Sequence, residues 1–486
     1  MNIFMTGATG FIGRSLLARL RRDGHHVCAW VRNVQRAKEL LGSEAQLIPA
    51  AGGMQALQDA IAPCKGVIHL AGEPILGERW TDARRKALVE SRVGLTHQLV
   101  EAMSGMPSTS SRAFVCASAT GVYGDRGDEC LSEESKAGND FLAQLCQDWE
   151  KEARRVSSHG IRSVQVRIGI VLGQGGGVLD RILPLFRAGL GGWIRNGKQY
   201  WPWIHLNDLI ELFVTALTDE RYEGPIHGTS PNPVTNRTWT QALGKVLRRP
   251  IVLPLPAVTL KMALGEGATV LLRSQRVLPV KAQALGFQFQ YPSLDVALAH
   301  ILDISSVHIQ SIPSQQDTSQ ENHPKSSYLK KHPPSYLLNT SCRLNKKVEE
   351  AYHFFSTPDN LGFLTPSKFH FHIQETHTVM GQGTEIHYRL RLGPIPLRWR
   401  TKIEIWQPGR CFVDSQQQGP YSCWWHEHYF DTEGGLTVMK DKIYYAPPFG
   451  WLGRIIHWLL IAPALREIFS YRAHMIQLRF GVSHKS

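Results

Sequence analysis

The sequence predicts an α/β protein with a doubly wound parallel sheet and a small carboxyl-terminal lobe, followed by a separate α+β domain. Two observations carry this prediction. Over residues 1–303, short apolar runs that end in small-residue turns alternate with segments of helical periodicity, which is typical of parallel βαβ units. Beyond residue 334, several apparent strands follow one another without intervening helices, which is typical of an antiparallel sheet.

A glycine-rich turn at residues 6–13 follows the first apolar run and precedes a helical pattern. Gly7 permits a sharp turn, Gly10 lets the backbone approach a pyrophosphate, and Gly13 lets helix and strand pack closely. Phosphates would bind at the helix N-terminus, where free N–H groups and the helix dipole favour anions. The alternative is an ordinary strand–turn–helix junction. We predict a dinucleotide site that includes Gly7, Thr9, Gly10, Phe11, Ile12 and Gly13.

The second predicted strand, residues 26–31, ends at Arg32 and Asn33. A carboxylate here would bind the ribose 2′-hydroxyl of NAD, whereas an arginine suits the 2′-phosphate of NADP. The alternative is that Arg32 is one more surface cation. A further buried strand at residues 66–70 ends in a small-residue turn of the kind that lines the cofactor groove. We predict NADP as the cofactor and add Arg32, Asn33, Leu70, Ala71, Gly72 and Arg167 to its binding residues.

The next strand, residues 113–119, runs into Thr120-Gly121-Val122-Tyr123-Gly124. Together with the two turns above, this order resembles the extended short-chain dehydrogenase/reductase superfamily. More narrowly, it is similar to the atypical NAD(P)-dependent epimerase family of sugar nucleotide epimerase-like proteins. The resemblance covers about residues 1–300, of which 250–300 resemble that family's carboxyl-terminal extension. It implies a Rossmann fold and NAD(P)-dependent chemistry on a carbonyl or sugar-nucleotide-like substrate.

The superfamily's usual Tyr-x-x-x-Lys pair is missing, because no tyrosine has a lysine four residues later. Ser118 matches the residue that polarises the substrate oxygen, and Cys146 and Glu150 stand at the Tyr and Lys positions. Glu150 would raise the pKa of the Cys146 thiol. Alternatively, Cys146 is a small core residue and Glu150 an exposed carboxylate that pairs with Arg154. The catalytic candidates are Ser118, Tyr123, Cys146 and Glu150.

Residues 304–334 are rich in Ser, Gln, Pro and Lys and cannot bury much apolar surface, so we predict a flexible linker between domains 1–303 and 335–486. The second domain's order is a strand, two helices, a run of strands and a long last helix. This order resembles the helix-grip fold of the START/Bet v 1-like polyketide cyclase and lipid-transfer superfamily. It implies an apolar cavity for a small hydrophobic ligand. The residues that line this cavity or form an aromatic core are Trp399, Trp406, Trp424, Trp425 and Trp451.

Four histidines alternate along predicted strands, so that each pair shares one face: His370, His372, His426 and His428. Because no carboxylate or cysteine clearly completes a ligand set, we predict no metal site. The eight cysteines form no Cys-x-x-Cys pair, which suits a reducing compartment.

The formal net charge of +13 comes from scattered basic residues, with no run of five or six. We therefore expect a phosphorylated ligand, or merely a basic surface, rather than nucleic acid. Residues 449–465 are apolar but short for a bilayer span, and no signal peptide precedes the first strand. These features predict a cytoplasmic protein with no integral membrane segment.

Two functions remain open. The first is an NADP-dependent oxidoreductase or epimerase that acts on a carbonyl or sugar-nucleotide-like small molecule and is fused to a hydrophobic-ligand domain. The second is an NADP-binding sensor or carrier that lacks the Tyr-x-x-x-Lys chemistry.

Overall fold

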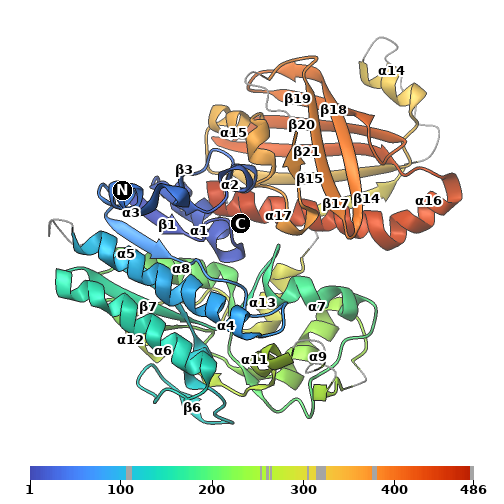
Figure 1. Cartoon of the computed structure of the whole chain (residues 1–486). Coiled ribbons are helices and arrows are strands. Elements are labelled where there is room, and N and C mark those ends of the chain that lie inside the picture. Colours follow the sequence, from blue (N-terminus) through green and yellow to red (C-terminus); the bar gives the residue numbers. More distant parts are fainter. Residues whose placement is uncertain are drawn as a thin grey trace. The chain divides into compact units, whose positions relative to one another are not determined.

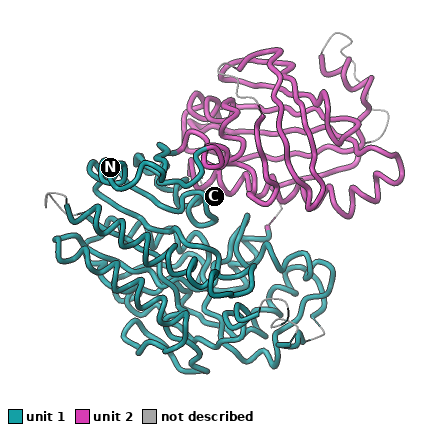
Figure 2. The backbone as a smooth tube through the Cα atoms, in the orientation of Figure 1, with its two compact units in different colours: residues 1–34, 45–302 teal, residues 35–44, 303–486 magenta. Residues whose placement is uncertain are grey.

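The computed structural model describes residues 1–105, 112–251, 254–258, 262, 265–303, 306–312, 324–374 and 380–481. They divide into two compact units (Figure 2), one of residues 1–34 and 45–302 and one of residues 35–44 and 303–486. Among the described residues, no helix is both long and apolar enough to cross a membrane.

A seven-stranded, wholly parallel sheet forms the centre of the first unit, in the order β11-β7-β5-β4-β1-β2-β3. Its strands β1, β3 and β7 are labelled in Figure 1. The direction of strand order reverses between β1 and β4. Loops diverge at such a point and leave a crevice beyond the carboxyl ends of the strands. The predicted doubly wound parallel sheet is confirmed. Its strands are β1 (Asn2–Thr6), β2 (His26–Val31), β3 (Gln46–Pro49), β4 (Gly66–His69), β5 (Ala113–Ala119), β7 (Arg162–Ile168) and β11 (Gly224–Gly228).

Helices pack in two groups against this sheet. One group contains α1 and α8, joined by an ion pair between Arg19 and Glu211 at 2.9 Å. The other contains α3, α5 and α6 in a row. The helices of this unit before its carboxyl-terminal part are α1 (Phe11–Arg22), α3 (Gly53–Ile61), α4 (Asp82–Val89), α5 (Leu95–Ser104), α6 (Phe141–Arg154), α7 (Gly177–Arg187), α8 (Leu206–Thr218) and α9 (Asn236–Leu247). Except for its first residue, α2 (Val34–Leu41) belongs to the second unit.

A smaller lobe surrounds an apolar cluster that includes Trp203, Trp239 and Leu298. Its described carboxyl-terminal part contains three short helices, and residues 252–253, 259–261 and 263–264 of the predicted extension lie outside the described residues. The helices are α11 (Thr269–Leu272), α12 (Val280–Ala284) and α13 (Leu294–Ile301). The short strands are β6 (Cys130–Leu131), β8 (Ile170–Leu172), β9 (Tyr200–Trp201), β10 (Trp203–His205), β12 (Val234–Thr235) and β13 (Arg276–Val277).

The second unit is built on an eight-stranded antiparallel sheet, in the order β14-β15-β21-β20-β19-β18-β17-β16. The predicted order of a strand, helices, a run of strands and a long last helix is confirmed. The strands are β14 (Val307–Ser311), β15 (Tyr336–Leu344), β16 (His372–Ile373), β17 (Glu385–Leu392), β18 (Ile395–Gln407), β19 (Cys411–Gln418), β20 (Cys423–Glu433) and β21 (Leu436–Ala446). The helices are α14 (Pro324–Lys331), α15 (Val348–Phe355), α16 (Gly450–Ile456) and α17 (Ala462–Phe480).

The predicted flexible linker differs from the structure in two places. Residues 307–311 form the edge strand β14, whose Val307 packs into the apolar cluster of the second unit. Residues 324–331 form α14, whose Tyr328 and Leu329 pack against Trp425 and its neighbours. A few well-placed apolar side chains therefore anchor segments whose average composition is polar. Residues 304–305 and 313–323 lie outside the described residues.

Candidate functional site

The glycine-rich turn joins the end of β1 to the start of α1. Gly7 has a left-handed backbone (φ +73°), and a Cβ there would lie 2.7 Å from the backbone nitrogen of Ala71. A Cβ on Gly13 would collide with the carbonyl oxygen of Gly7. Gly10 is exposed at the N-cap of α1, and among the described residues no side chain caps this helix. The helix N-terminus is thus open to an anion.

Two residues that the sequence analysis missed fasten this turn to the β4 turn. The Thr6 Oγ1 lies 2.6 Å from the Nδ1 of His69 and accepts a hydrogen bond from the Ala71 N–H at 3.3 Å. Burial, together with the charge of Arg92, lowers the pKa of His69 to about 3. His69 is therefore neutral near pH 7. The only sequence signal was its position as the last residue of a buried strand.

The loop after β8 packs on Phe11 at the beginning of α1. A Cβ on Gly176 would lie 2.6 Å from the Phe11 ring, and one on Gly173 would lie 3.1 Å from it. This loop can approach so closely because glycine has no side chain. Three loops, after β1, β4 and β8, therefore meet beside the predicted phosphate position.

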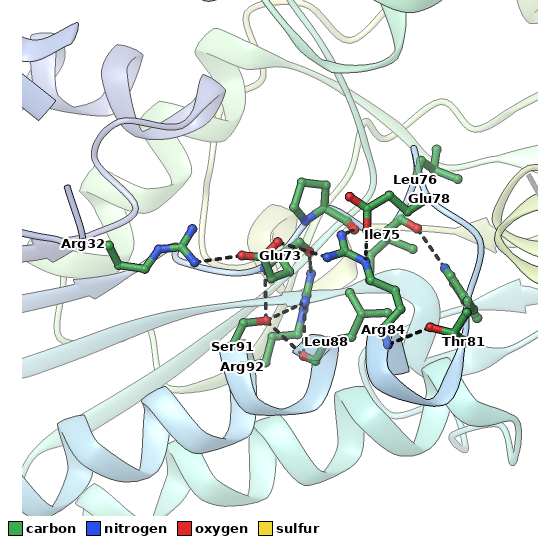
Figure 3. Close-up of polar contacts among 12 residues, drawn as sticks. Arg32, Glu73, Ile75, Leu76, Glu78, Thr81, Arg84, Leu88, Ser91 and Arg92 are labelled. Atoms are coloured by element: carbon green, nitrogen blue, oxygen red, sulfur yellow. Dashed lines mark hydrogen bonds and ion pairs between the residues drawn. The ribbon is translucent and has the colours of Figure 1, made fainter. Parts of the chain in front are cut away.

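Arg32 extends from the end of β2 toward Glu73 (Figure 3). Its Nη1 donates to the Glu73 carboxylate at 2.9 Å, although 87% of the Arg32 side chain is exposed. Arg84 donates to the other Glu73 oxygen at 3.2 Å. Hydrogen bonds from Arg32 and then Arg84 lower the pKa of Glu73. The carboxylate thus holds Arg32 at the edge of the crevice in a contact open to water.

Ser91 and Arg92, in the helical segment Glu90–Gly94 that follows α4, hold the backbone of Glu73 in place. Its N–H donates to the Ser91 Oγ at 3.1 Å, and its carbonyl accepts from the Arg92 Nη2 at 2.9 Å (Figure 3). Arg92 also packs its guanidinium over the Trp149 ring at 5.4 Å. The Leu70-Ala71-Gly72 turn therefore runs into a rigid segment rather than a free loop.

The catalytic candidates Ser118 and Glu150 belong to one buried network. The Ser118 hydroxyl donates to Glu150 Oε1 at 2.7 Å. Arg167 forms a bidentate pair with the same carboxylate, at 2.8 Å from Nε and 2.9 Å from Nη2. Arg154, the partner suggested by the sequence, lies 3.7 Å away. The alternative of an exposed Glu150 is wrong because the side chain is buried and β7 supplies a better-placed cation.

Tyr123 lies on the other side of Arg167. Its hydroxyl lies 2.5 Å from the Nε2 of His227 and accepts from Arg167 Nη1 at 2.7 Å. Burial raises the pKa of Tyr123 to about 12. Arg167 also donates to the Glu133 carbonyl at 3.0 Å. In this structure Nε, Nη1 and Nη2 of Arg167 all donate to protein oxygens, and its predicted place among the cofactor-binding residues stays a prediction.

Cys146 packs in an apolar cluster with Val122, Tyr123 and Leu131. Burial and then the Glu150 charge raise the pKa of the Cys146 thiol to about 12, in the direction that the sequence suggested. The structure thus brings all four catalytic candidates together, but inside the protein and with partners of their own. Such a network orients and rigidifies the ends of β5 and β7.

The second unit contains a large apolar cavity with about 1380 Å³ of empty space, its open mouth included. Trp399 and Trp424 line it, as predicted. Trp425 instead packs beside Leu329 outside the cavity, Trp406 packs on Tyr352 and Phe412, and Trp451 is exposed.

Two of the four alternating histidines also line this cavity. His426 and His428 lie on its wall with Asp414, whereas His370 and His372 are not among its lining residues. Asp414, which the sequence analysis did not connect with these histidines, therefore lies beside them.

A parallel sheet that reverses order between β1 and β4, with an uncapped helix after a glycine turn at that point, defines the class of dinucleotide-binding α/β proteins. Residues 3–226 match the NAD dependent epimerase/dehydratase family, and residues 255–301 match a domain of unknown function, DUF1731. The chain belongs to the NAD dependent epimerase/dehydratase family.

Relatives occur in distant organisms. The chain is 38% identical over 303 residues to the chloroplastic epimerase family protein SDR39U1 homolog of Arabidopsis thaliana, covering 62% of this chain and 87% of the relative. It is 34% identical over 303 residues to the epimerase family protein YfhF of Bacillus subtilis, covering 62% of this chain and 98% of YfhF. The crystal structure of human epimerase family protein SDR39U1 (isoform 2) with NADPH is similar with a TM-score of 0.55 and 32% identity, over 62% of this chain and 99% of that one.

Proposed function

We propose that the first unit binds NADP in the crevice between β1 and β4 and uses it as an oxidoreductase or epimerase on a carbonyl or sugar-nucleotide-like substrate. The observation that carries the proposal is the open N-terminus of α1 beside an exposed Arg32 at the end of β2. The human relative solved with NADPH supports it. When bound, the cofactor would supply or accept the hydride.

The binding roles follow from position. The glycine turn, with Thr9, Phe11 and Ile12, would hold the pyrophosphate against α1. Leu70, Ala71 and Gly72 would border the other side, and Asn33 lies next to Arg32 at the adenosine end. A 2′-phosphate would compete with Glu73 for Arg32, because a guanidinium binds phosphate in a strong bidentate geometry.

The buried network favours a second candidate, an NADP-binding sensor or carrier. Ser118 already donates its hydroxyl to Glu150 at 2.7 Å, and Tyr123 and Cys146 are buried with raised pKa values. A group that passes a proton must reach the substrate and have a pKa near the working pH. None of these three meets both conditions in this arrangement.

One experiment separates the two candidates. The full chain is mixed with NADPH and a panel of carbonyl compounds and sugar nucleotides, and the absorbance of the reduced nicotinamide is followed. An oxidoreductase predicts NADPH oxidation by a carbonyl compound. An epimerase returns the hydride and leaves the cofactor unchanged overall, so it predicts a second epimer of a sugar nucleotide, detected by chromatography after incubation with NADP⁺. Ser118→Ala should remove either activity, and the exposed control Ser158→Ala should keep it. NADPH binding with neither NADPH oxidation nor formation of a new epimer would favour the sensor or carrier.

For the second unit, we propose residues 335–486 as a START/Bet v 1-like domain that binds a small hydrophobic ligand, joined to the domain of residues 1–303. The apolar cavity lined by Trp399, Trp424 and Phe469 supports this. A fluorescent fatty acid displaced by an unlabelled one would test it, and Leu390→Trp, which fills the cavity, should weaken the binding about tenfold or more. The free cysteines agree with the predicted cytoplasmic location.

A further inference from the structure

A polar cluster interrupts the apolar wall of the cavity in the second unit. Asp414 lies on β19 directly opposite His426 of β20, and His428 of the same strand lies directly opposite Asp441 of β21. His426 and His428 are two residues apart and therefore share the inward face of β20. Their side chains are 8% and 6% exposed. A buried group of this polarity needs partners that balance its charge.

The distances around Asp414 do not suit hydrogen bonds. Its Oδ2 lies 3.6 Å from the Nδ1 of His426 and 3.5 Å from the Nε2 of His428. A proton shared between such atoms would draw them to about 2.7–2.9 Å. Ligands that surround one tetrahedral metal at about 2.0–2.1 Å are themselves about 3.3–3.4 Å apart. The two separations from Asp414 are close to this value, and ligand atoms of the three residues all lie within 4.8 Å of one another.

The remaining ring nitrogens face a second carboxylate. Asp441 Oδ1 lies 2.7 Å from the Nδ1 of His428 and 3.4 Å from the Nε2 of His426. Metal-binding histidines are commonly oriented in this way by an outer carboxylate. Arg472 of α17 lies 3.9 Å from Asp441, and Phe412 stacks on the His428 ring with centroids 4.1 Å apart.

The charges agree with this arrangement. Asp414 and Asp441 bring two carboxylates to the cluster, and Arg472 brings one guanidinium. A divalent cation between Asp414 and the two imidazoles would place positive charge beside the Asp414 carboxylate. Two imidazoles and one carboxylate suit zinc and related transition metals better than calcium or magnesium.

We propose that Asp414, His426 and His428 bind one divalent transition-metal ion on the cavity wall, with Asp441 orienting both imidazoles. Three protein ligands leave at least one coordination position open, as in catalytic zinc sites. Since all three residues line the cavity, that position faces it and would take an oxygen atom of a mainly apolar ligand. Only this last step rests on the proposed ligand binding of the second unit.

Cobalt(II) is the probe of choice, because its visible d–d absorption reports the ligands. We expect the chelator-treated full chain to bind one Co²⁺ per chain, with d–d bands and without the near-ultraviolet band of cobalt bound to thiolate. Asp414→Asn and His426→Asn should each lower the affinity at least tenfold. The control is His387→Asn, which removes a histidine of β17 that lies 3.6 Å from Glu385 outside the cluster.

Every outcome decides the proposal. Absent d–d bands, a thiolate band alone, or unchanged binding in both cluster variants would overturn it. If a variant fails to fold by circular dichroism, the stoichiometry and spectrum of the native chain decide instead. A shift of the d–d bands on adding octanoate would support the open position, whereas intact bands that do not shift would remove only the ligand step.

A second inference comes from the surface of the same unit. The segment 449–460, which covers α16 and the turn of helix after it, exposes seven large apolar side chains. Phe449, Trp451 and Trp458 are 73%, 72% and 75% exposed. The residues on α16 and the following turn recur at helical spacing, so they form one apolar face. They are Trp451, Leu452, Ile455, Trp458, Leu459 and Leu460.

Charge and continuity indicate what this face contacts. Residues 442–466 contain Lys442, Arg454 and Arg466 and no Asp or Glu. Immediately after the exposed segment, Ile461 and Leu465 line the cavity. A surface helix with Trp and Leu on one face and cations beside it is typical of helices that lie in the headgroup layer of a bilayer.

We infer that the segment 449–460 docks on an anionic lipid surface, with the cavity opening beside it. The full chain should sediment with vesicles of phosphatidylcholine and phosphatidylserine, and less with phosphatidylcholine alone. The double variant Trp451→Ala/Trp458→Ala should lose at least tenfold in vesicle affinity, while Leu190→Ala, which removes a comparably exposed residue of the first unit, should not.

Three results would overturn this inference. They are no sedimentation with anionic vesicles, equal binding by the double variant, or a dimer of the native chain that the double variant abolishes. The last would make a second copy of the chain the occupant of the face.

Discussion

The cofactor crevice of the first unit and the cavity of the second unit are built in different ways. The crevice depends on backbone: a turn of consecutive residues with glycines where a Cβ would collide with Ala71 or with Gly7 itself. The cavity depends on side chains from separate strands and a helix, with Asp414, His426 and Arg472 brought together by register and packing. Local backbone motifs can be recognised in a sequence, whereas constellations across strands cannot.

The buried Ser118–Glu150–Arg167 network lies between these two cases. Its members come from β5, α6 and β7, so their meeting depends on the sheet order. It resembles the cavity cluster in its origin, but each of its groups has a partner at hydrogen-bond distance. The difference is that the groups of the network lie at hydrogen-bond distance from their partners, whereas the Asp414 carboxylate lies 3.5–3.6 Å from the two imidazoles.

The largest expected effect is on the backbone site. Gly7→Ala adds a Cβ at φ +73° that would lie 2.7 Å from the Ala71 nitrogen, so the turn must shift. We expect NADPH affinity to fall more than about 100-fold, or about 2.7 kcal/mol, by calorimetric titration. Gly24→Ala is the matched control, because Gly24 has φ +77° with nothing within 4 Å of the added atom. Equal affinities for the two variants would contradict the role of the turn.

Glu150→Gln tests whether the network supports the fold. It leaves the buried Arg167 without its charge partner, and removing one member of a buried pair costs about 3–5 kcal/mol. The loss should appear in the free energy of unfolding by denaturant titration. Asp148→Asn, an exposed change on the same helix, should stay within about 0.5 kcal/mol. A stable Glu150→Gln protein without turnover would instead identify Glu150 as catalytic.

His69 should make unit 1 sensitive to acid. Its folded pKa of about 3 lies below the ordinary 6.5, so the unfolded chain binds the proton more tightly, and stability falls as pH drops from 6.5 toward 3. From pH 7.5 to pH 5 this contributes about 2 kcal/mol of lost stability. In the His69→Asn variant, the free energy of unfolding should therefore fall by about 2 kcal/mol less between pH 7.5 and pH 5 than in the native chain. The exposed change His159→Asn should leave this pH dependence unaltered, and a parallel curve for His69→Asn would refute the effect.

Much of the fold could be predicted, since the strands of the parallel sheet are continuous apolar runs and those of the second unit are separated by clear turns. The glycine-rich turn at residues 6–13 was also predicted, because its glycines are close together in the sequence between a strand and a helix. The pairing of Arg167 with Glu150 was not predicted, because nothing in the spacing shows that β7 and α6 face each other. Asp414 was missed because it is twelve positions from His426 in the chain and opposite it only in the sheet.

The predicted linker shows a further limit of composition. Val307, Tyr328 and Leu329 lie in polar surroundings in the sequence, yet each packs against the second unit's sheet. An average over a window hides one or two apolar residues that suffice to fix a short strand or helix. The boundaries of the second unit therefore depend on packing that only the folded structure reveals.

The central claim is that the glycine-rich turn at residues 6–13 binds the pyrophosphate of a dinucleotide and that Arg32 selects its 2′-phosphate. Calorimetric titration of the full chain with NADPH and NADH, repeated for Arg32→Ala, tests it most directly. We expect native affinity for NADPH to exceed that for NADH, and Arg32→Ala to lose about tenfold in NADPH affinity, about 1.4 kcal/mol, with little change for NADH. Equal affinities of the native chain for the two coenzymes, or no binding of either, would contradict the account.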